Sequence, residues 1–212
     1  MRALAYGTLA AVLLSTLPAR GVAAQTTLTA DLTNANETVP VVPTLVSGEL
    51  RPVSFGFVTA TLNADQTALF WTAVINNIDV TGTQTEDPND NLVAAHIHNA
   101  PPGVNGGVVW GFFGTPFNDT DPSNTTLVPF ASGVGGTFTG TWDLNEGNGT
   151  TLTAQLPNIL AGNTYMNFHT TQFPGGEIRG NLAVVPEPST VLLLGSGLAL
   201  VGLGAARRRQ RA

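Results

Sequence analysis

The sequence of 212 residues has no cysteine and no lysine, and all eight basic residues are arginines. Without cysteine the chain has no disulfide and no thiolate metal site, so its stability depends on packing. Only two arginines lie between residues 25 and 185, against thirteen carboxylates, which gives this segment a net charge of −11. This charge excludes nucleic acid and anionic lipid as partners. We expect most of the acidity to serve solubility.

Helical periodicity is missing between residues 25 and 185, where apolar and polar residues often alternate. In Thr137–Leu144, the clearest case, Phe138, Trp142 and Leu144 share one face of a strand. The other predicted strands are Val53–Leu62, Thr67–Ile75, Leu92–His98, Gly107–Phe113, Thr151–Leu156, Thr164–Thr170 and Glu177–Val184. Many short strands without helices predict an all-β domain, an antiparallel β-sandwich of immunoglobulin-like or Greek-key type. A closed barrel is the rival architecture.

The two ends of the chain predict export. Residues 1–24 begin with Met1-Arg2, continue with an apolar run and end in small residues, which is typical of a helical signal peptide cut after Ala24. At the other end, the uncharged residues 189–206 are long enough for a transmembrane helix of roughly 27 Å. The arginine-rich residues 207–211 would hold that end in the cytoplasm.

The last segment, residues 185–212, resembles the PEP-CTERM sorting signal. It has Pro186-Glu187-Pro188, then the apolar helix, then the arginine-rich end, in the order of that signal. The resemblance implies recognition by an exosortase, transient anchoring in the inner membrane with the domain in the periplasm, and removal of the tail. Release to the cell surface or the exopolysaccharide matrix would follow. An ordinary tail anchor is the alternative.

All three histidines lie in two segments far apart in the chain. The first is Ala95-His96-Ile97-His98-Asn99, followed by a Gly-Val-Asn-Gly turn at residues 103–106. The second runs from Tyr165-Met166-Asn167-Phe168-His169-Thr170 to Gly175-Gly176-Glu177-Ile178-Arg179-Gly180. Together these segments resemble the CHRD (chordin-type) domain, over residues 25–184. The resemblance implies an extracellular β-domain and leaves its activity open, and the acidic loop Thr83–Asn91 looks longer than the usual family connection.

Strand geometry predicts where these side chains point. His96 and His98, two residues apart on a strand, share one face, and Ile97 lies on the other. A hairpin around residues 174–176 would fix the register of the second segment. The predicted pairs are Asn167 with Arg179, Phe168 with Ile178 and His169 with Glu177. If Ile97 and Phe168 face the core, all three histidines project from the outer surface of the sheet.

Three neutral imidazoles on one surface suit zinc or copper, so we predict a metal site of His96, His98 and His169. Glu177 is expected as a fourth ligand or as an acceptor beside the ligands. The alternative is that the histidines simply hydrogen-bond Asn, Glu177 or backbone carbonyls. Arg179 is expected to pair with Glu177 on the sheet surface.

Other residues offer further candidates. The carboxylates Asp119 and Asp121, and those of the 83–91 loop, have oxygens for calcium, but we expect solvated loops. An EF-hand is excluded because Leu92 stands where its turn glycine belongs. Trp110 is expected in the core, with stacking on a sugar as the alternative.

Two classes of function follow. The first is a non-enzymatic, exported surface or matrix module that binds a metal through its histidines, which the absence of an assembled catalytic motif favours. The second is a metal-dependent extracellular enzyme, either superoxide dismutase-like or a hydrolase. A two-metal dismutase site needs more than three histidines, which leaves that form of the enzyme unavailable.

Overall fold

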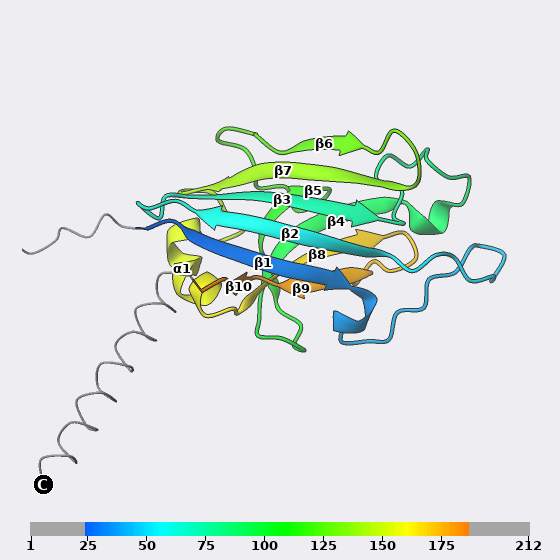
Figure 1. Ribbon diagram of the computed structural model, residues 1–212, viewed down its shortest axis with the longest axis horizontal. Coiled ribbons are helices and arrows are strands. Elements are labelled where there is room, and N and C mark those ends of the chain that lie inside the picture. Colours follow the sequence, from blue (N-terminus) through cyan, green and yellow to red (C-terminus); the bar gives the residue numbers. More distant parts are fainter. Residues whose placement is uncertain (1–23, 187–212) are drawn as a thin grey trace, which may run out of the picture.

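The computed structural model describes residues 24–186, which form an all-β domain (Figure 1). Its strands are β1 (Thr26–Thr33), β2 (Phe55–Leu62), β3 (Ala68–Asn76), β4 (Leu92–Asn99), β5 (Gly107–Phe113), β6 (Thr126–Pro129), β7 (Gly135–Asp143), β8 (Thr164–Thr170), β9 (Ile178–Asn181) and β10 (Ala183–Val184). The helices are the α-helix α1 (Leu152–Leu160) and the short 3-10 helices η1 (Asn34–Asn36) and η2 (Pro88–Asp90).

The predicted terminal helices fall outside this part of the chain. Residues 1–23 of the predicted signal peptide and the predicted transmembrane helix at 189–206 lie outside the described residues. Within residues 24–186, no helix combines the length and the apolar character needed to cross a membrane.

The strands form one sheet, and the prediction of a two-sheet β-sandwich is wrong. The sheet has ten strands in the order β5-β4-β8-β9-β1-β2-β3-β7-β6, and β10 pairs with β1. All of these strand pairs are antiparallel. Because β5 and β6 are edge strands, the sheet does not close, and it curls into a half-barrel instead of the rival barrel. The order of strands along a sheet is not encoded in local alternation, which explains the error.

The core fills the inside of the curl. In Figure 1 the half formed by β1, β2, β3, β7 and β6 lies in front of the half that contains β5, β4 and β8. Aromatic rings join the two halves, because Trp71 of β3 meets Trp110 and Phe112 of β5 at ring distances of 6.0 and 4.5 Å. Phe138 of β7 lies 5.7 Å from Phe168 of β8. Trp110 is completely buried, so it belongs to the core and offers no surface for a sugar.

Most predicted strands are present, and one is a helix. The predicted bounds of β5 and β8 are those of the structure, and β2 and β3 join through a turn at Asn63–Gln66. Strands β1 and β6 were not predicted. Residues 151–156 were expected to form a strand, but Thr151 instead caps α1, where its hydroxyl accepts from the Ala154 N–H at 3.3 Å.

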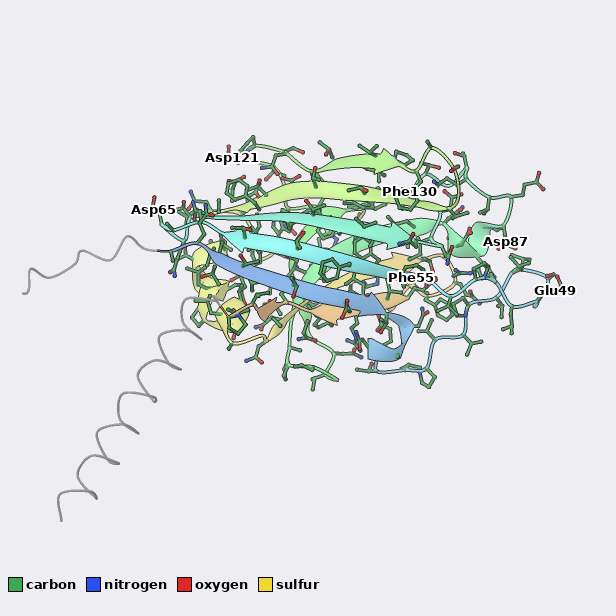
Figure 2. All side chains as sticks on the ribbon, viewed as in Figure 1. Glu49, Phe55, Asp65, Asp87, Asp121 and Phe130 are labelled. Carbon is green, nitrogen blue, oxygen red and sulfur yellow. The ribbon has the colours of Figure 1, made fainter. Side chains whose placement is uncertain are left out.

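Several carboxylates lie in loops at the two ends of the sheet. Figure 2 shows Asp65 and Asp121 at one end, and Glu49 and Asp87 at the other. Several serve their own loops: the carboxylate of Asp79, for example, accepts from the backbone N–H groups of Thr81, Gly82, Gln84 and Thr85. The carboxylate of Asp79 therefore holds the backbone at the start of the 83–91 loop.

Candidate metal centre

Strands β4 and β8 bring the three histidines together. The two strands are antiparallel neighbours, in which His96 lies opposite Asn167 and His169 lies opposite Ala94. Ile97 and Phe168 are completely buried in the core, as predicted, so the histidines project from the opposite face of the sheet. Two of the three predicted pairs between β8 and β9 are present, Asn167 with Arg179 and Phe168 with Ile178, whereas the pair of His169 with Glu177 is not formed because β9 begins at Ile178.

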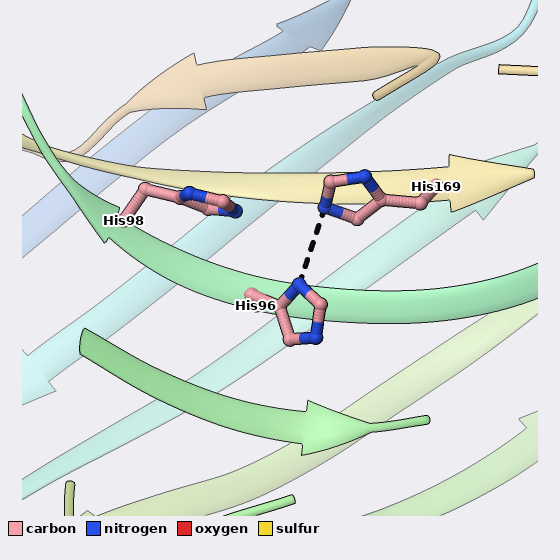
Figure 3. A group of neighbouring side chains, drawn as sticks. All are labelled: His96, His98 and His169. Atoms are coloured by element: carbon pink, nitrogen blue, oxygen red, sulfur yellow. Dashed lines mark hydrogen bonds between the residues drawn. The ribbon is translucent and has the colours of Figure 1, made fainter. Parts of the chain in front are cut away.

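The three imidazole rings surround one point (Figure 3). Nδ1 of His96 lies 3.2 Å from Nε2 of His169. One ligand nitrogen from each ring lies within 4.8 Å of the other two, and this is the only such group of histidine and carboxylate side chains between residues 24 and 186. The rings are therefore close enough to share an ion after small adjustments.

Backbone carbonyls define the tautomer of each ring. Nε2 of His96 lies 3.0 Å from the carbonyl of Thr115, Nδ1 of His98 lies 3.0 Å from that of Gly106, and Nδ1 of His169 lies 3.0 Å from that of Pro174. A carbonyl only accepts, so each of these nitrogens carries the proton. In the neutral ring the other nitrogen then carries an available lone pair. These nitrogens are Nδ1 of His96, Nε2 of His98 and Nε2 of His169.

Burial keeps the rings neutral. Desolvation, joined by repulsion from neighbouring histidines, lowers the pKa of His96 and of His169 to about 4. Desolvation also lowers the pKa of His98, and the positive charge of Arg179 adds to the effect. At neutral pH all three rings are thus unprotonated on their inward nitrogens, which is the form that binds metals.

The site is covered, which corrects the prediction of an outward surface. His96, His98 and His169 are only 4%, 8% and 6% exposed. The cover consists of the three loops whose carbonyls bind the rings. One of them packs against Gly111, where a Cβ would lie 1.8 Å from the carbonyl oxygen of Pro116 and 3.0 Å from Cδ2 of His96. A glycine is required there for the loop to approach the ring.

Tyr165 supports His98 from the neighbouring strand. Its ring stacks on the imidazole at 4.8 Å with an angle of 9° between the planes. Its hydroxyl accepts from the N–H of Gly106, at 3.1 Å, and the carbonyl of the same glycine holds Nδ1 of His98. Nε2 of His98 is buried without a partner in the described residues, which leaves its lone pair available to a ligand.

Glu177 is not brought to the histidines, contrary to the expected role beside the metal. Its carboxylate is completely buried and forms an ion pair with Arg51. The hydroxyls of Ser54 and Thr170 also donate to it, both at 2.6 Å. Both oxygens are thus engaged by other side chains, and Glu177 is not part of the group formed by the three histidines. The expected pair of Glu177 with Arg179 is wrong as well, because Arg179 pairs with Glu37 at 3.2 Å.

Glu37 and Arg51 escaped sequence analysis. Both lie in the long connection between β1 and β2, more than a hundred residues before their partners. No spacing motif joins such distant residues. Composition could have indicated these ion pairs, because Arg51 and Arg179 are the only lysine or arginine residues between residues 25 and 185. An arginine that is buried needs a carboxylate partner.

Two family models match the sequence. The CHRD domain model matches residues 28–182, and the PEP-CTERM protein-sorting motif matches residues 184–209. No curated protein and no solved structure matches the chain. The three histidines, with all the residues that contact them, lie inside the first matched range.

Proposed function

Since the chain belongs to the CHRD domain family and ends in a PEP-CTERM sorting motif, we propose that it is exported and sorted by an exosortase to the cell surface or the extracellular matrix. In this proposal the signal peptide of residues 1–24 starts export and the tail of residues 185–212 anchors the chain in the inner membrane until it is removed. The net charge of −11 between residues 25 and 185 suits a soluble exported domain.

The function of the domain, in our proposal, is to bind one transition-metal ion through His96, His98 and His169. The carrying observation is that each ring gives its N–H to a backbone carbonyl and turns a lone pair towards the other two rings. Ligand histidines in metal sites are usually held in this way, with the outer ring nitrogen donating to a carbonyl or carboxylate. A histidine cluster with a purely structural role has no need of three unprotonated nitrogens in one place.

Zinc and copper fit this set of donors. Neutral imidazole is a ligand for both ions, and the site offers neither thiolate for a soft ion nor carboxylate for calcium or magnesium. Three nitrogens leave one position of a tetrahedral zinc ion free for water or another ligand. When bound, the metal would act as a Lewis acid. The chain orients the ligands and excludes bulk water.

A metal-dependent enzyme remains the second candidate, because three histidines with an open position also occur in catalytic zinc sites. The buried position of the rings favours storage or structural binding over turnover, since their exposed fractions are below a tenth. A hydrolytic or dismutase activity that is lost in the His→Ala variants would support the enzyme.

The test is a metal titration of the full-length chain, purified without a histidine tag. These are the only histidines of the sequence, so every imidazole signal comes from this site. We expect one equivalent of zinc or copper to bind, and each single His→Ala variant to weaken binding more than about 100-fold, since loss of a mere supporting contact costs 10–100-fold. Binding that survives in the triple His→Ala variant contradicts the proposal.

A further inference from the structure

The three imidazole rings have no negatively charged neighbour across the strands. The residues opposite the histidines in the adjacent strands are all uncharged, namely Ala94, Val108, Gly111, Tyr165 and Asn167. The outer ring nitrogens donate to backbone carbonyls, whereas a carboxylate often takes this place beside a zinc ligand. Neutral ligands remove none of the charge of a bound ion, so an ion keeps its full charge in this site.

A positive charge lies near the rings. The guanidinium carbon of Arg179 lies 4.8 Å from the centre of the Tyr165 ring, and the Tyr165 ring stacks on His98 at 4.8 Å. Because β8 lies between β4 and β9, the tyrosine ring separates the guanidinium from the imidazole. Burial lowers the pKa of His98, and the charge of Arg179 lowers it further. Glu37 pairs with Arg179 at 3.2 Å and offsets part of this charge.

This electrostatic setting favours an ion of low charge. The free energy needed to move an ion from water into a protein interior rises with the square of its charge, so a divalent ion costs about four times as much as a monovalent one. Repulsion by Arg179 is about twice as large for the divalent ion. A carboxylate ligand would compensate for these costs, and the histidine group contains none in the described part of the chain.

The number of ligands points to the same kind of ion. Within residues 24–186 the group offers three nitrogens and no fourth histidine or carboxylate, and its rings are only 4%, 8% and 6% exposed. Zinc sites are almost always four-coordinate, and copper(II) prefers a tetragonal set of ligands. Copper(I) is stable with three nitrogen ligands in a trigonal arrangement, and it carries a single charge. It therefore matches both the ligand set and the charge of the site.

We propose that the three histidines select copper(I) over divalent ions, and that Arg179 contributes to this selection through its charge. The inference rests on the metal site proposed above and adds the identity and the charge of its ion. The hydrogen bonds of Arg179 go to Asn36, Val104 and Asn105, so it acts on the ion through its electric field. The sequence contains no cysteine, so no thiolate of the chain competes for copper(I).

The test compares copper(I) and zinc in the full-length chain, purified without a histidine tag. Copper(I) is titrated anaerobically at pH 8, with ascorbate, in competition with bicinchoninate. Zinc is titrated at the same pH in competition with a chromophoric chelator. We expect the Kd for copper(I) to lie at least about 100-fold below the Kd for zinc. X-ray absorption of the copper(I) form should show three nitrogen neighbours and no fourth ligand.

Two variants measure the contribution of Arg179. Arg179→Met removes the positive charge, so zinc should gain about three- to tenfold in affinity relative to copper(I), as expected for one charge roughly 10 Å away. Glu37→Gln removes the offsetting carboxylate, which is ionised at pH 8 because its pKa is about 7, and should shift the ratio in the opposite direction. This second variant also serves as the test if Arg179→Met fails to fold.

The ratio of the two affinities separates charge from structure. A structural disturbance changes both affinities alike and leaves their ratio unchanged. The double variant Arg51→Met/Glu177→Gln is the matched control and should keep the wild-type ratio, because it removes a buried ion pair that has no contact with an imidazole.

The outcomes for the ion and for the site are distinct. Zinc that binds as tightly as copper(I), or a fourth ligand in the absorption spectrum, overturns the choice of copper(I) and leaves the metal site standing. An equal ratio in wild type, Arg179→Met and Glu37→Gln overturns the role of Arg179. Absence of binding of both ions in the wild type, or binding that survives in the triple His→Ala variant, overturns the proposed function and this inference with it.

Discussion

Nδ1 of His96 and Nε2 of His169 face each other at 3.2 Å, although each ring has committed its proton to a backbone carbonyl on the opposite side. Two lone pairs at this distance repel each other, and a second proton on one ring would require a pH near the lowered pKa of about 4. A cation between them relieves the repulsion. Two nitrogens on a tetrahedral zinc ion, each about 2.05 Å from the metal, are about 3.3 Å apart.

Metal binding should raise the melting temperature of the full-length chain. An ion at a hundredfold excess over its Kd stabilises the folded state by about 2.7 kcal/mol, which for a domain of this size is a rise of about 5–10 °C. The measurement is thermal unfolding with zinc or copper, and again after addition of a chelator. The His96→Ala/His98→Ala/His169→Ala variant is the control and should show the same melting temperature under both conditions.

The metal-free protein should lose stability as the pH falls from 6.5 towards 4. The pKa of His96 and of His169 is about 4 in the folded chain and 6.5 in the unfolded one, so the unfolded state takes up protons first. Above pH 6.5 the two rings do not reduce the free energy of unfolding. Below pH 6.5 this free energy decreases, by up to a few kcal/mol for each ring.

Two measurements check this pH dependence. NMR titration of the three imidazoles should show the midpoints of His96 and His169 near 4, and midpoints near 6.5 would contradict the burial of the rings. Chemical unfolding at several pH values should show the loss of stability. It is best measured in the Glu37→Gln variant. The raised pKa of Glu37 makes the free energy of unfolding decrease as the pH rises from 4.5 to 7, which is opposite to the effect of the histidines.

Local alternation predicted much of the sheet because strands with one face in the core repeat every two residues. It gave the bounds of β5 and β8, and in the predicted strand Leu92–His98, which is β4, it gave the shared face of His96 and His98. It failed at α1, whose apolar residues Leu152, Leu156 and Ile159 recur at helical spacing over too short a run to be distinguished from a strand.

The cover of the metal centre was beyond sequence reasoning for a different reason. The carbonyls of Gly106, Thr115 and Pro174 belong to three loops, and every residue has a carbonyl. Which carbonyls accept from the histidines depends on how the chain folds back over the sheet. The same holds for the ion pair of Glu177 with Arg51. Contacts between residues far apart are determined by strand order, which no local pattern contains.

Gly111→Ala should damage the metal centre through its cover. The new Cβ would meet the carbonyl oxygen of Pro116 at 1.8 Å, so the loop that holds His96 through Thr115 must move away. We expect a loss of about 1–3 kcal/mol in the free energy of unfolding, and weaker metal binding. Gly107→Ala on the same strand is the matched control, because nothing lies within 4 Å of its Cβ position. Equal metal affinity in the two variants would show that the loop does not position His96.

The ion pair of Arg51 and Glu177 should govern stability and leave the metal untouched. Both side chains are almost completely buried, at 2% and 0% exposure, and Glu177 also accepts from Ser54 and Thr170. Replacing one partner leaves the other charge buried and unpaired, so Arg51→Met alone should cost about 3–5 kcal/mol of unfolding free energy. The double variant Arg51→Met/Glu177→Gln should recover part of this loss, because no unpaired charge remains, and urea unfolding of the two variants measures the difference. Metal affinity should be unchanged in the double variant, since neither residue contacts an imidazole. A drop as large as that of a histidine variant would show that Glu177 takes part in metal binding.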